Sequence, residues 1–358
     1  MNAPFVLSRD GIRLADLRDP LECARIDAFL AERDDSSPFH GPKWLCAVAE
    51  STGNRAGALV DEARGAIRAY LPFNEIHSPI FGRVLASSGF AVGGGLLTEA
   101  PDKAEKLFAA ARELAERQSC PSIELRGGAL PQGRDGWHVQ TASHCNFDRE
   151  LATDEEAELK AIPRKQRAEV RKGLNADLEV RTGTTPADRE AHYGVYAESV
   201  RNLGTPVFPK SLFDAVLDAF GDAADILTVA HEGKAVASVL SLYHRGTVMP
   251  YWGGGTWDAR RLRANERMYF ELMLHARRRG CTRFDFGRSK TDSGAYYFKK
   301  NWGFEPAPLA YAAWTAPGFD PRDANPSSAR HRLQVAAWQK LPLRVANGLG
   351  PFIARGLG

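Results

Sequence analysis

Apolar residues recur at intervals of three and four along several stretches of the chain, and this spacing predicts amphipathic helices. The clearest stripe, within residues 102–117, consists of Leu107, Phe108, Ala111, Leu114 and Ala115. The same spacing, with Pro, Asp or Gly near the ends, predicts helices at residues 20–32, 42–50, 209–220 and 264–279. We expect only short elements between Arg181 and Asp225.

Runs rich in β-branched and aromatic residues lie between these helices and predict strands. They cover residues 54–73, with a turn at Asp61-Glu62, and then residues 79–95, 122–126, 138–151, 225–248 and 248–252. Strands that alternate with helices in this order predict an α/β protein with a mixed sheet.

The second half of the chain repeats the order of the first. Gly93-Gly94-Gly95 and Gly253-Gly254-Gly255 each end a strand and precede a long helix, and Cys120 and Cys281 follow those helices at nearly the same offset. The strand Ile123–Gly127 corresponds to Phe284–Arg288. A unit repeated at a constant offset indicates a duplication. We therefore predict one domain over residues 1–152, a second over 153–316, and a tail over 317–358.

Composition narrows the class of protein. The chain has 358 residues and a net charge of only +3, so any basic site is local rather than global. No run approaches 18 apolar residues, and charged residues interrupt the first twenty positions, which argues against a membrane span or a signal peptide. Five scattered cysteines without a Cys-x-x-Cys pair, and histidines without ligand spacing, predict a reducing cytoplasm and no metal site.

A basic segment opens the second domain. Between Lys160 and Lys172 six Lys or Arg residues accompany a single acid, Glu169. Arg164, Arg167 and Arg171 are spaced to lie on one face of a helix that begins after Pro163. In a chain of nearly balanced charge, this segment is a candidate anion-binding surface.

A second candidate lies between Thr282 and Trp314. Phe284 and Phe286 alternate with Asp285 in a short strand, and Gly287 lets the backbone leave it. A short helix follows, on which Phe298 and Trp302 share one face and Lys299 points away from it. Two interpretations remain: the lysines lie beside a cleft at the end of the strand, or they are the solvated side of a surface helix.

The tail has an unusual charge pattern. From Ala324 to Gly358 there is no Asp or Glu, while Lys340, Arg344 and other cations alternate with large apolar residues. The segment is either a helix packed on the second domain or a basic amphipathic face for a membrane surface. Pro342, Gly348, Gly350 and Pro351 are expected to break a long helix, which favours the packed interpretation.

Four motifs together resemble a known family. They are Ile162-Pro-Arg-Lys-Gln-Arg-Ala-Glu-Val-Arg-Lys, the Gly-Gly-Gly-Thr strand end, Phe284-Asp-Phe-Gly-Arg-Ser, and Tyr297-Phe-Lys-Lys-Asn-Trp-Gly-Phe-Glu-Pro. They resemble the FemAB-like branch of the GNAT acyltransferase superfamily. The similarity is greatest to the FemAB-related proteins associated with exosortase (PEP-CTERM) and exopolysaccharide systems, and it covers roughly residues 5–315.

The resemblance implies two tandem GNAT-like (acyl-CoA N-acyltransferase-like) domains. It also implies aminoacyl or acyl transfer to an amine or hydroxyl of a cell-envelope or exopolysaccharide precursor. The best-studied members move an amino acid from aminoacyl-tRNA to the stem peptide of a peptidoglycan precursor. By position, the resemblance assigns the acceptor–donor cleft to Arg164, Arg167, Arg171, Lys172, Lys299 and Lys300.

The chemistry of acyl transfer suggests further roles, because it needs an oriented nucleophile, a proton acceptor and donors that face the oxyanion. Lys299 is the candidate for charge stabilisation, Arg288 for pairing with a carboxylate or phosphate, and Asp285 for a base or an ion-pair partner. Tyr297 and Ser289 are candidates for orienting a substrate. Tyr251 and Trp252 either stack on a substrate or belong to the core. Lys43 and Asn74 are predicted in loops of the first domain that face the same cleft.

The chain departs from the CoA-dependent members at one place. These carry Gln/Arg-x-x-Gly-x-Gly/Ala after the central strand, whereas residues 255–265 here have no spaced glycines. Two donors therefore remain, aminoacyl-tRNA and acyl-CoA, with no tightly bound cofactor expected.

The expected partners are an envelope-precursor small molecule or a lipid-linked saccharide, tRNA if it is the donor, and the inner membrane through the tail. The alternative function is a non-catalytic GNAT-like binding module for an anionic saccharide or lipid-linked carrier.

Overall fold

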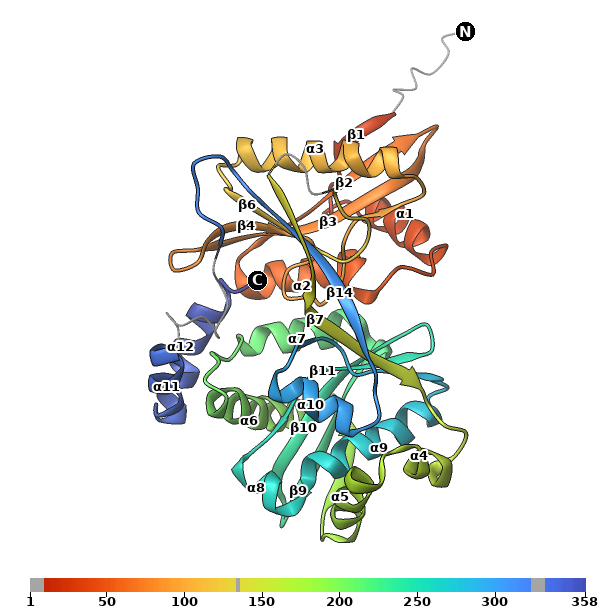
Figure 1. Cartoon of the computed structure of the whole chain (residues 1–358), viewed down its shortest axis with the longest axis vertical. Helices are drawn as coiled ribbons and strands as arrows, with labels where there is room; N and C mark the ends of the chain where they lie inside the picture. The colour runs from red at the N-terminus through yellow and green to blue at the C-terminus, as the bar shows by residue number, and fades with distance from the viewer. Residues whose placement is uncertain (1–9, 133–135, 323–331) are drawn as a thin grey trace. The chain divides into compact units, whose positions relative to one another are not determined.

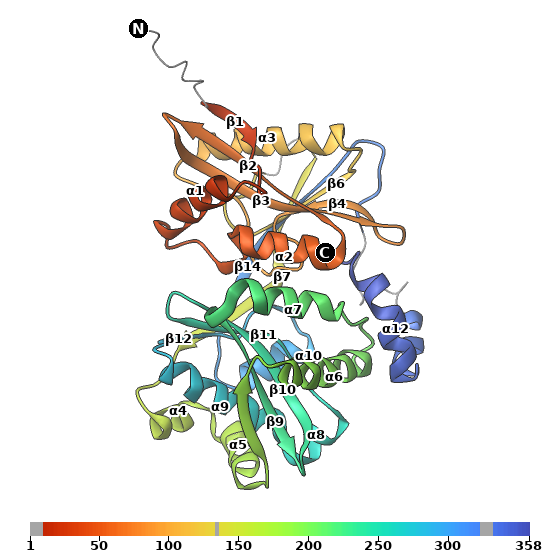
Figure 2. The same ribbon diagram turned by 180° about the vertical axis from the view of Figure 1, so that it is seen from behind.

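A computed structural model describes residues 10–132, 136–322 and 332–358. The chain forms two compact units (Figures 1 and 2). Unit 1 comprises residues 1–140, 310–324 and 355–358, and unit 2 comprises residues 141–309 and 325–354. The two units interleave along the chain, whereas the boundaries predicted from the sequence are continuous.

Unit 1 is a sheet with helices on both faces. Its strands are β1 (Gly11–Leu14), β2 (Arg55–Ala63), β3 (Ala66–Ser78), β4 (Gly82–Ala86), β5 (Leu97–Thr98), β6 (Ser122–Arg126) and the second half of β14 (Pro306–Thr315). Its helices are α1 (Pro20–Ala31), the 3-10 turn η1 (Pro38–His40), α2 (Pro42–Thr52) and α3 (Pro101–Arg117). The strand order is β1-β2-β3-β4-β6-β14, and β5 pairs with β3.

Apolar side chains alternate between the two faces of β2 and β3, and each face packs against different helices of unit 1. Leu59 and Leu71 pack with α3, while Val60 and Tyr70 pack with α1 on the opposite face. This is the period-two pattern of a strand that is covered on both faces. Figures 1 and 2 show α3 on one side of these strands and α1 and α2 on the other.

The turn between β2 and β3 differs from the prediction. It lies at Arg64-Gly65, both with positive φ, rather than at Asp61-Glu62. Asp61 and Glu62 stay in the strand because cations reach them: Lys103 Nζ lies 2.9 Å from Asp61 Oδ2, and two arginines contact Glu62. The charged pair resembled a turn in the sequence, whereas tertiary ion pairs keep it in the sheet.

Unit 2 has a second sheet. Its strands are the second part of β7 (Trp137–Glu150), β8 (Glu179–Gly183), β9 (Ala224–His231), β10 (Lys234–His244), β11 (Thr247–Gly255), β12 (Arg283–Asp285) and β13 (Ser289–Lys290). The helices are α4 (Glu155–Ala161), α5 (Arg164–Asn175), α6 (Pro186–Asn202), α7 (Lys210–Phe220), the 3-10 turn η2 (Gly221–Ala223), α8 (Trp257–Leu262), α9 (Ala264–Arg278), α10 (Gly294–Asn301), α11 (Arg332–Gln339) and α12 (Leu343–Ala354). The strand order is β7-β12-β11-β10-β9-β8, with β13 paired to β7.

Helices cover both faces of this sheet as well. Leu227, Val229 and Val239 point into a core shared with α9. Thr228 on β9 and Ser238 on β10 are adjacent to these residues and point to the opposite face of the sheet. There Ser238 Oγ lies 3.0 Å from Nδ1 of His192 on α6. The predicted mixed α/β sheet is therefore confirmed.

Both units contain the same short parallel pair of strands. In unit 1, β4 and β6 pair only at Leu85–Ile123 and Ala86–Glu124. In unit 2, β11 and β12 pair only at Thr247–Arg283 and Val248–Phe284, although β11 continues to Gly255. In unit 1, β4 ends at Ala86, and in unit 2, β12 ends at Asp285. The matching pairs support the duplication, although Gly93-Gly94-Gly95 lies between β4 and β5 and does not end a strand as Gly253-Gly254-Gly255 does.

Two helix predictions were wrong. Helix α6 has 17 residues where only short elements were expected. Its buried face mixes His192 and Asp188 with apolar residues, so no apolar stripe marks it in the sequence. Pro342 does separate α11 from α12, as expected, but α12 continues through Gly348, Gly350 and Pro351, because packing on unit 2 overrides the weak helix propensity of these residues.

Candidate functional site

Lys299 is a buried cation at the end of strand β12. It lies near the end of α10, a helix that begins after Ser293, whose side chain accepts the N–H of Tyr296. Only 8% of Lys299 is exposed, and its Nζ donates to the carbonyl oxygens of Gly287 at 2.8 Å and Arg288 at 2.9 Å. The solvated-surface interpretation is therefore wrong for Lys299.

The turn after β12 creates this arrangement. Gly287 has a φ of +73°, a conformation that glycine adopts without strain. The N–H of Gly287 donates to Asp285 Oδ1 at 2.9 Å, while the carbonyls of Gly287 and Arg288 face the amine. One short loop thus places a carboxylate and an ammonium at the same strand end.

Burial shifts the pKa of both Lys299 and Asp285. Loss of solvation lowers the pKa of Lys299 to about 7, although the charge of Asp285 opposes this shift. Burial raises the pKa of Asp285, against the hydrogen bond from Gly287. Titratable groups with perturbed pKa values at a strand end are typical of catalytic sites.

Strand β7 adds two polar residues that the sequence interpretation missed. Asp148 lies opposite Asp285 in the antiparallel register, and its carboxylate forms an ion pair with Arg283. Asn146 donates to Asp148 Oδ1 at 3.3 Å and hydrogen-bonds to Asp285. Alternate polar residues along β7 are the signal that could have indicated them. The ion pair with Arg283 is thus made by Asp148.

The other candidates from this segment lie in different environments. Ser289 is buried at the start of β13, and its Oγ has no hydrogen-bond partner among the described residues. Arg288 is partly exposed beside it. Tyr297 is 52% exposed and donates to Asp292 Oδ1 at 3.0 Å, on the side of α10 away from Lys299. Lys300 is exposed, as the surface interpretation predicted.

The basic helix α5 begins beside this site. A Cβ on Gly303, just after α10, would lie 3.0 Å from the ring of Pro163 and 3.4 Å from the carbonyl oxygen of Ala161. Gly173 likewise allows α5 to approach α9, because a Cβ there would lie 2.7 Å from the carbonyl oxygen of Arg263. The two candidate segments of the sequence therefore meet in unit 2.

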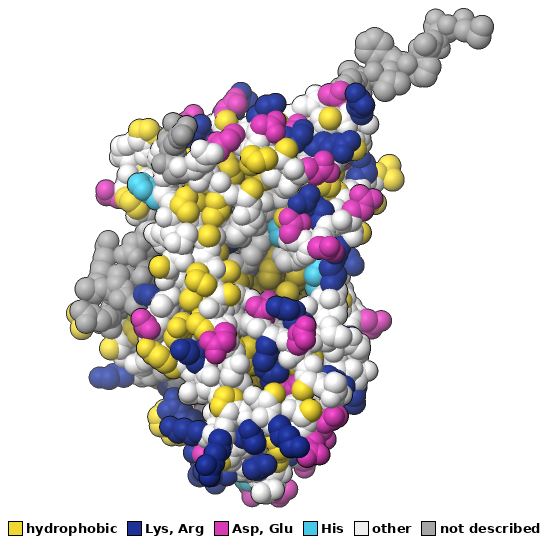
Figure 3. Space-filling model, turned by 45° about the vertical axis from the view of Figure 1, so that its right-hand side comes forward, with side chains coloured by type: hydrophobic (Ala, Val, Ile, Leu, Met, Phe, Trp, Pro, Cys, Tyr) yellow, Lys and Arg dark blue, Asp and Glu magenta, His cyan; other side chains and the backbone are white. Residues whose placement is uncertain are grey.

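The cations of α5 fall into two groups: some contact partners within the fold, and others are exposed to solvent. Arg167 donates to the backbone carbonyls of Lys160 and Ile162, so it holds the end of α4 rather than facing outward. Lys172 pairs with Glu169 at 2.8 Å. Arg164 and Arg171 are exposed. Figure 3 shows Lys and Arg side chains gathered at the end of unit 2 where α5 and α8 lie in Figure 1.

Tyr251 and Trp252 belong mainly to the core. Trp252 is 4% exposed, and its ring centroid lies 4.7 Å from that of Phe213 on α7. Tyr251 is partly exposed and packs edge-on against Trp252. The core interpretation therefore holds for Trp252.

Lys43 and Asn74 belong to unit 1 and lie in regular elements rather than in loops. Lys43 is exposed on α2 and acts electrostatically on Asp27. Asn74 is fully buried in β3, where its side chain donates to the carbonyl of Leu45 and accepts the N–H of Gly89. These hydrogen bonds give Asn74 a structural role.

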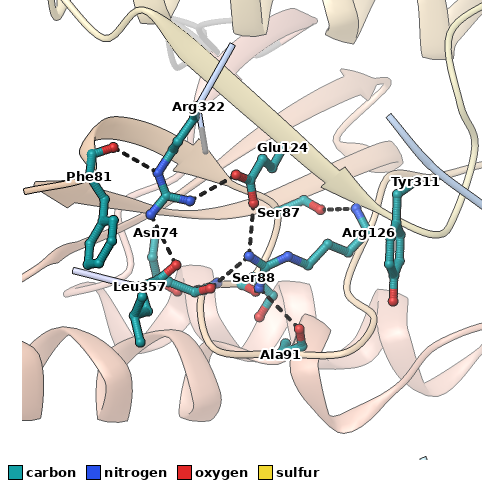
Figure 4. Close-up of polar contacts among 12 residues, drawn as sticks. Asn74, Phe81, Ser87, Ser88, Ala91, Glu124, Arg126, Tyr311, Arg322 and Leu357 are labelled. Atoms are coloured by element: carbon teal, nitrogen blue, oxygen red, sulfur yellow. Dashed lines mark hydrogen bonds and ion pairs between the residues drawn. The ribbon is translucent and has the colours of Figure 1, made fainter. Parts of the chain in front are cut away.

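The strand end of unit 1 that corresponds to the β12 site is filled (Figure 4). Glu124 accepts from Arg126 at 3.0 Å and from Arg322 at 2.9 Å. Burial alone would raise the pKa of Glu124, but the two guanidinium groups lower it. Their remaining donors bind backbone carbonyls, including those of Gly356, Leu357 and Gly358. Because its own chain occupies this strand end, unit 1 offers no comparable cationic site there.

The segment that would hold a CoA pyrophosphate is helical. Residues 257–262 form α8, whose N–H groups bond largely within the chain instead of forming an open glycine cradle. Asn265 lies at the start of α9, and a Cβ on Gly255 would lie 2.6 Å from its Oδ1. These residues do not fit the usual CoA loop.

Two features are absent from the residues that the structure describes. Within residues 10–132, 136–322 and 332–358, no group of three His, Cys, Asp or Glu side chains could hold a metal ion. No helix in the described part of the chain combines the length and apolarity needed to cross a membrane.

Comparison with known proteins identifies the class of domain. Residues 163–300 match the family described as an acetyltransferase (GNAT) domain. The predicted GNAT fold and the prediction of an acyltransferase are confirmed. No curated protein matches the chain in sequence.

Solved structures share the fold of both units. A crystal structure of FemX has a TM-score of 0.63 at 14% identity, with 81% of this chain and 95% of that chain covered. A tandem GNAT protein from the clavulanic acid biosynthesis pathway has a TM-score of 0.57 at 13% identity, covering 86% and 100%. L-PGS from Bacillus licheniformis has a TM-score of 0.51 at 14% identity, covering 84% and 93%. The chain is thus similar in fold to FemX and to a tandem GNAT protein.

Proposed function

We propose that the protein is an aminoacyl or acyl transferase that modifies an amine or hydroxyl of a cell-envelope or exopolysaccharide precursor. The observation on which this depends is the buried ammonium of Lys299 at the end of strand β12 in a GNAT domain. A cation that loses solvation without a close ion-pair partner destabilises the fold, so its retention is best explained by chemistry.

Lys299 would act on the oxyanion of the transfer reaction. The acceptor amine or hydroxyl attacks the acyl carbonyl, the carbonyl oxygen becomes negative, and the bond to the leaving oxygen or sulfur then breaks. An ammonium has three N–H donors, and two of those of Lys299 bind the carbonyls of Gly287 and Arg288. The third would stabilise the oxyanion in a site of low polarity.

Asp285 is the proposed proton acceptor. Its raised pKa brings the carboxylate closer to the pKa of the groups it would deprotonate. The proton that leaves the nucleophile would pass through Asp285 to the leaving group, so the enzyme ends the cycle unchanged. Arg288 and Ser289, which flank the Lys299 contacts, would bind the substrate.

Aminoacyl-tRNA is the proposed donor, with acyl-CoA as the competing one. The helical segment 257–262 and the exposed Arg164 and Arg171 on α5 support a large phosphate backbone rather than a pyrophosphate held by a glycine loop. The resemblance in sequence to proteins associated with exosortase and exopolysaccharide systems directs the choice of acceptor. Peptide stems, sugar nucleotides and lipid-linked saccharides are the candidates.

The test is a transfer assay with purified protein. Labelled aminoacyl-tRNAs and labelled acyl-CoAs are each supplied with a panel of these acceptors. We expect transfer from aminoacyl-tRNA, a strong loss of turnover in Lys299→Ala and Arg288→Ala, and little change in the exposed control Lys300→Ala. Absence of transfer from every donor class by folded protein would contradict the proposal.

The same variants separate an enzyme from a non-catalytic binding module. In an enzyme, Lys299→Ala loses turnover and keeps ligand binding, because the ammonium acts on the transition state. In a binding module the variant loses binding, and no turnover exists to lose. For tRNA, affinity should fall steeply as salt rises, and indifference to salt would exclude it.

A further inference from the structure

Helix α12 exposes its large apolar residues and buries its small ones. Val345, Leu349 and Phe352 follow one another at i, i+4 and i+7, and they are 43%, 50% and 68% exposed. Ala346, Gly350 and Ala354 are buried on the other side. A surface helix of a globular protein normally has the opposite arrangement.

Close packing on unit 2 fixes this orientation. A Cβ on Gly350 would lie 2.9 Å from the backbone nitrogen of Val207 and 3.1 Å from its carbonyl oxygen. Only a helix face of small residues can approach the backbone this closely. Figure 1 shows α12 beside α11, and Figures 1 and 2 both show α12 at the end of α6. The large side chains therefore face solvent because the small ones are needed at the contact. Rotation of the helix would bring large side chains against the backbone of Val207.

Neighbouring residues extend the apolar surface. Leu333 on α11 is 83% exposed, and Leu203 at the end of α6 is 65% exposed. The two elements are in contact, because a Cβ on Gly204 would lie 2.4 Å from Cγ1 of Val335 on α11. We call Leu203, Leu333, Val345, Leu349 and Phe352 the α11–α12 face.

The tail segment that carries α11 and α12 holds charge of one sign. The sequence from Ala324 to Gly358 holds no Asp or Glu, and both Lys340, between α11 and α12, and Arg344, in the first turn of α12, are exposed. A basic rim around large apolar side chains complements an anionic lipid surface, where apolar groups enter the boundary of the acyl chains and cations contact headgroups. Binding to a protein partner would not explain why this segment lacks Asp and Glu.

We propose that the α11–α12 face binds the surface of an anionic lipid bilayer. Val345, Leu349 and Phe352 enter the interface, while the long side chains of Lys340 and Arg344 extend to the headgroups. The proposal is independent of the transfer chemistry and holds whether or not the protein is an enzyme. It would place the protein next to lipid-linked substrates.

Vesicle sedimentation tests this with the full chain. Vesicles of phosphatidylcholine containing phosphatidylglycerol are compared with vesicles of phosphatidylcholine alone. We expect binding to the anionic vesicles that weakens with salt. The variant Val345→Ser/Leu349→Ser/Phe352→Ser should lose at least about tenfold in partitioning, since apolar area no longer enters the interface.

Charge variants and a matched control complete the experiment. Neutralising Lys340 or Arg344 with Gln should each reduce partitioning about fivefold. The control Leu21→Ser/Ile80→Ser removes two exposed apolar side chains of unit 1 and should bind as the unchanged protein does. Thermal unfolding checks that every variant is folded, which is expected because the replaced side chains are exposed.

Several results would overturn the proposal. The first is that folded protein does not bind anionic vesicles, and the second is that the triple variant binds them equally well. A third result would be that the unchanged protein does not bind vesicles and is a dimer by light scattering, and that the triple variant is a monomer. That result would assign the α11–α12 face to a second copy of the chain.

Discussion

Replacement of Lys299 by Met should stabilise the protein at low pH relative to high pH while it abolishes activity. Met keeps an unbranched side chain, one atom shorter, and removes the buried ammonium. The pKa of Lys299 falls from 10.5 in the unfolded chain to about 7 in the fold, so the unfolded state binds more protons between these values. The penalty for burying the charge is full below pH 7 and is relieved as the pH rises toward 10.5.

The magnitude follows from these two values. Between pH 6 and pH 9 the free energy of unfolding of the unchanged protein should rise by about 3 kcal/mol through Lys299 alone. Met also loses two hydrogen bonds to the carbonyls of Gly287 and Arg288, each worth about 1 kcal/mol. That loss does not depend on pH. The stability of Lys299→Met relative to the unchanged protein should therefore fall by about 3 kcal/mol from pH 6 to pH 9.

Urea unfolding at both pH values, followed by circular dichroism, measures this difference. Lys300→Met is the matched control, because Lys300 is the exposed neighbour and its replacement should change stability by less than about 0.5 kcal/mol at either pH. A stability difference for Lys299→Met that is the same at pH 6 and pH 9 would refute the argument that burial depresses the pKa. Activity that survives the replacement would refute the catalytic role.

Three further predictions concern the scaffold. Gly95→Ala should unfold or strongly destabilise the protein, because its Cβ would lie 1.7 Å from the carbonyl oxygen of Gly127, whereas Gly93→Ala meets no atom within 4 Å and should be nearly neutral in thermal unfolding. Burial lowers the pKa of His192 to about 3 from 6.5, so the chain should lose about 3 kcal/mol between pH 7 and pH 4, and His192→Phe should remove that acid sensitivity. Glu124→Gln should cost about 3 kcal/mol or more in urea unfolding, since it leaves two buried guanidinium groups without their carboxylate; an unchanged midpoint would contradict this.

Local patterns predicted most of the regular elements. The stripe at residues 102–117 became α3, and the runs around Glu232-Gly233-Lys234 became β9 and β10, because hydrophobic periodicity and turn residues act over a few positions. The prediction failed where distant residues decide. Asp61 and Glu62 stay in a strand through ion pairs with Lys103, Arg13 and Arg25, and α6 forms around a buried His192 that no stripe announces.

The candidate site shows the same division. The sequence indicated Lys299, Asp285 and Arg288, because the strand, the glycine and the short helix are contiguous. It did not indicate Asn146 and Asp148, which reach the site only through antiparallel pairing of β7 with β12. It assigned a substrate role to Arg167, whose guanidinium instead binds the carbonyls of Lys160 and Ile162.

Most helices and strands other than α6, the duplication and the local excess of positive charge were determined by the sequence itself, since each depends on the types and spacing of nearby residues. The tertiary structure decided which cations are solvated and which are buried. Lys299 and Lys300 are adjacent in the chain, yet only one is enclosed by loop carbonyls and aromatic rings, because burial depends on what the rest of the fold places around a side chain.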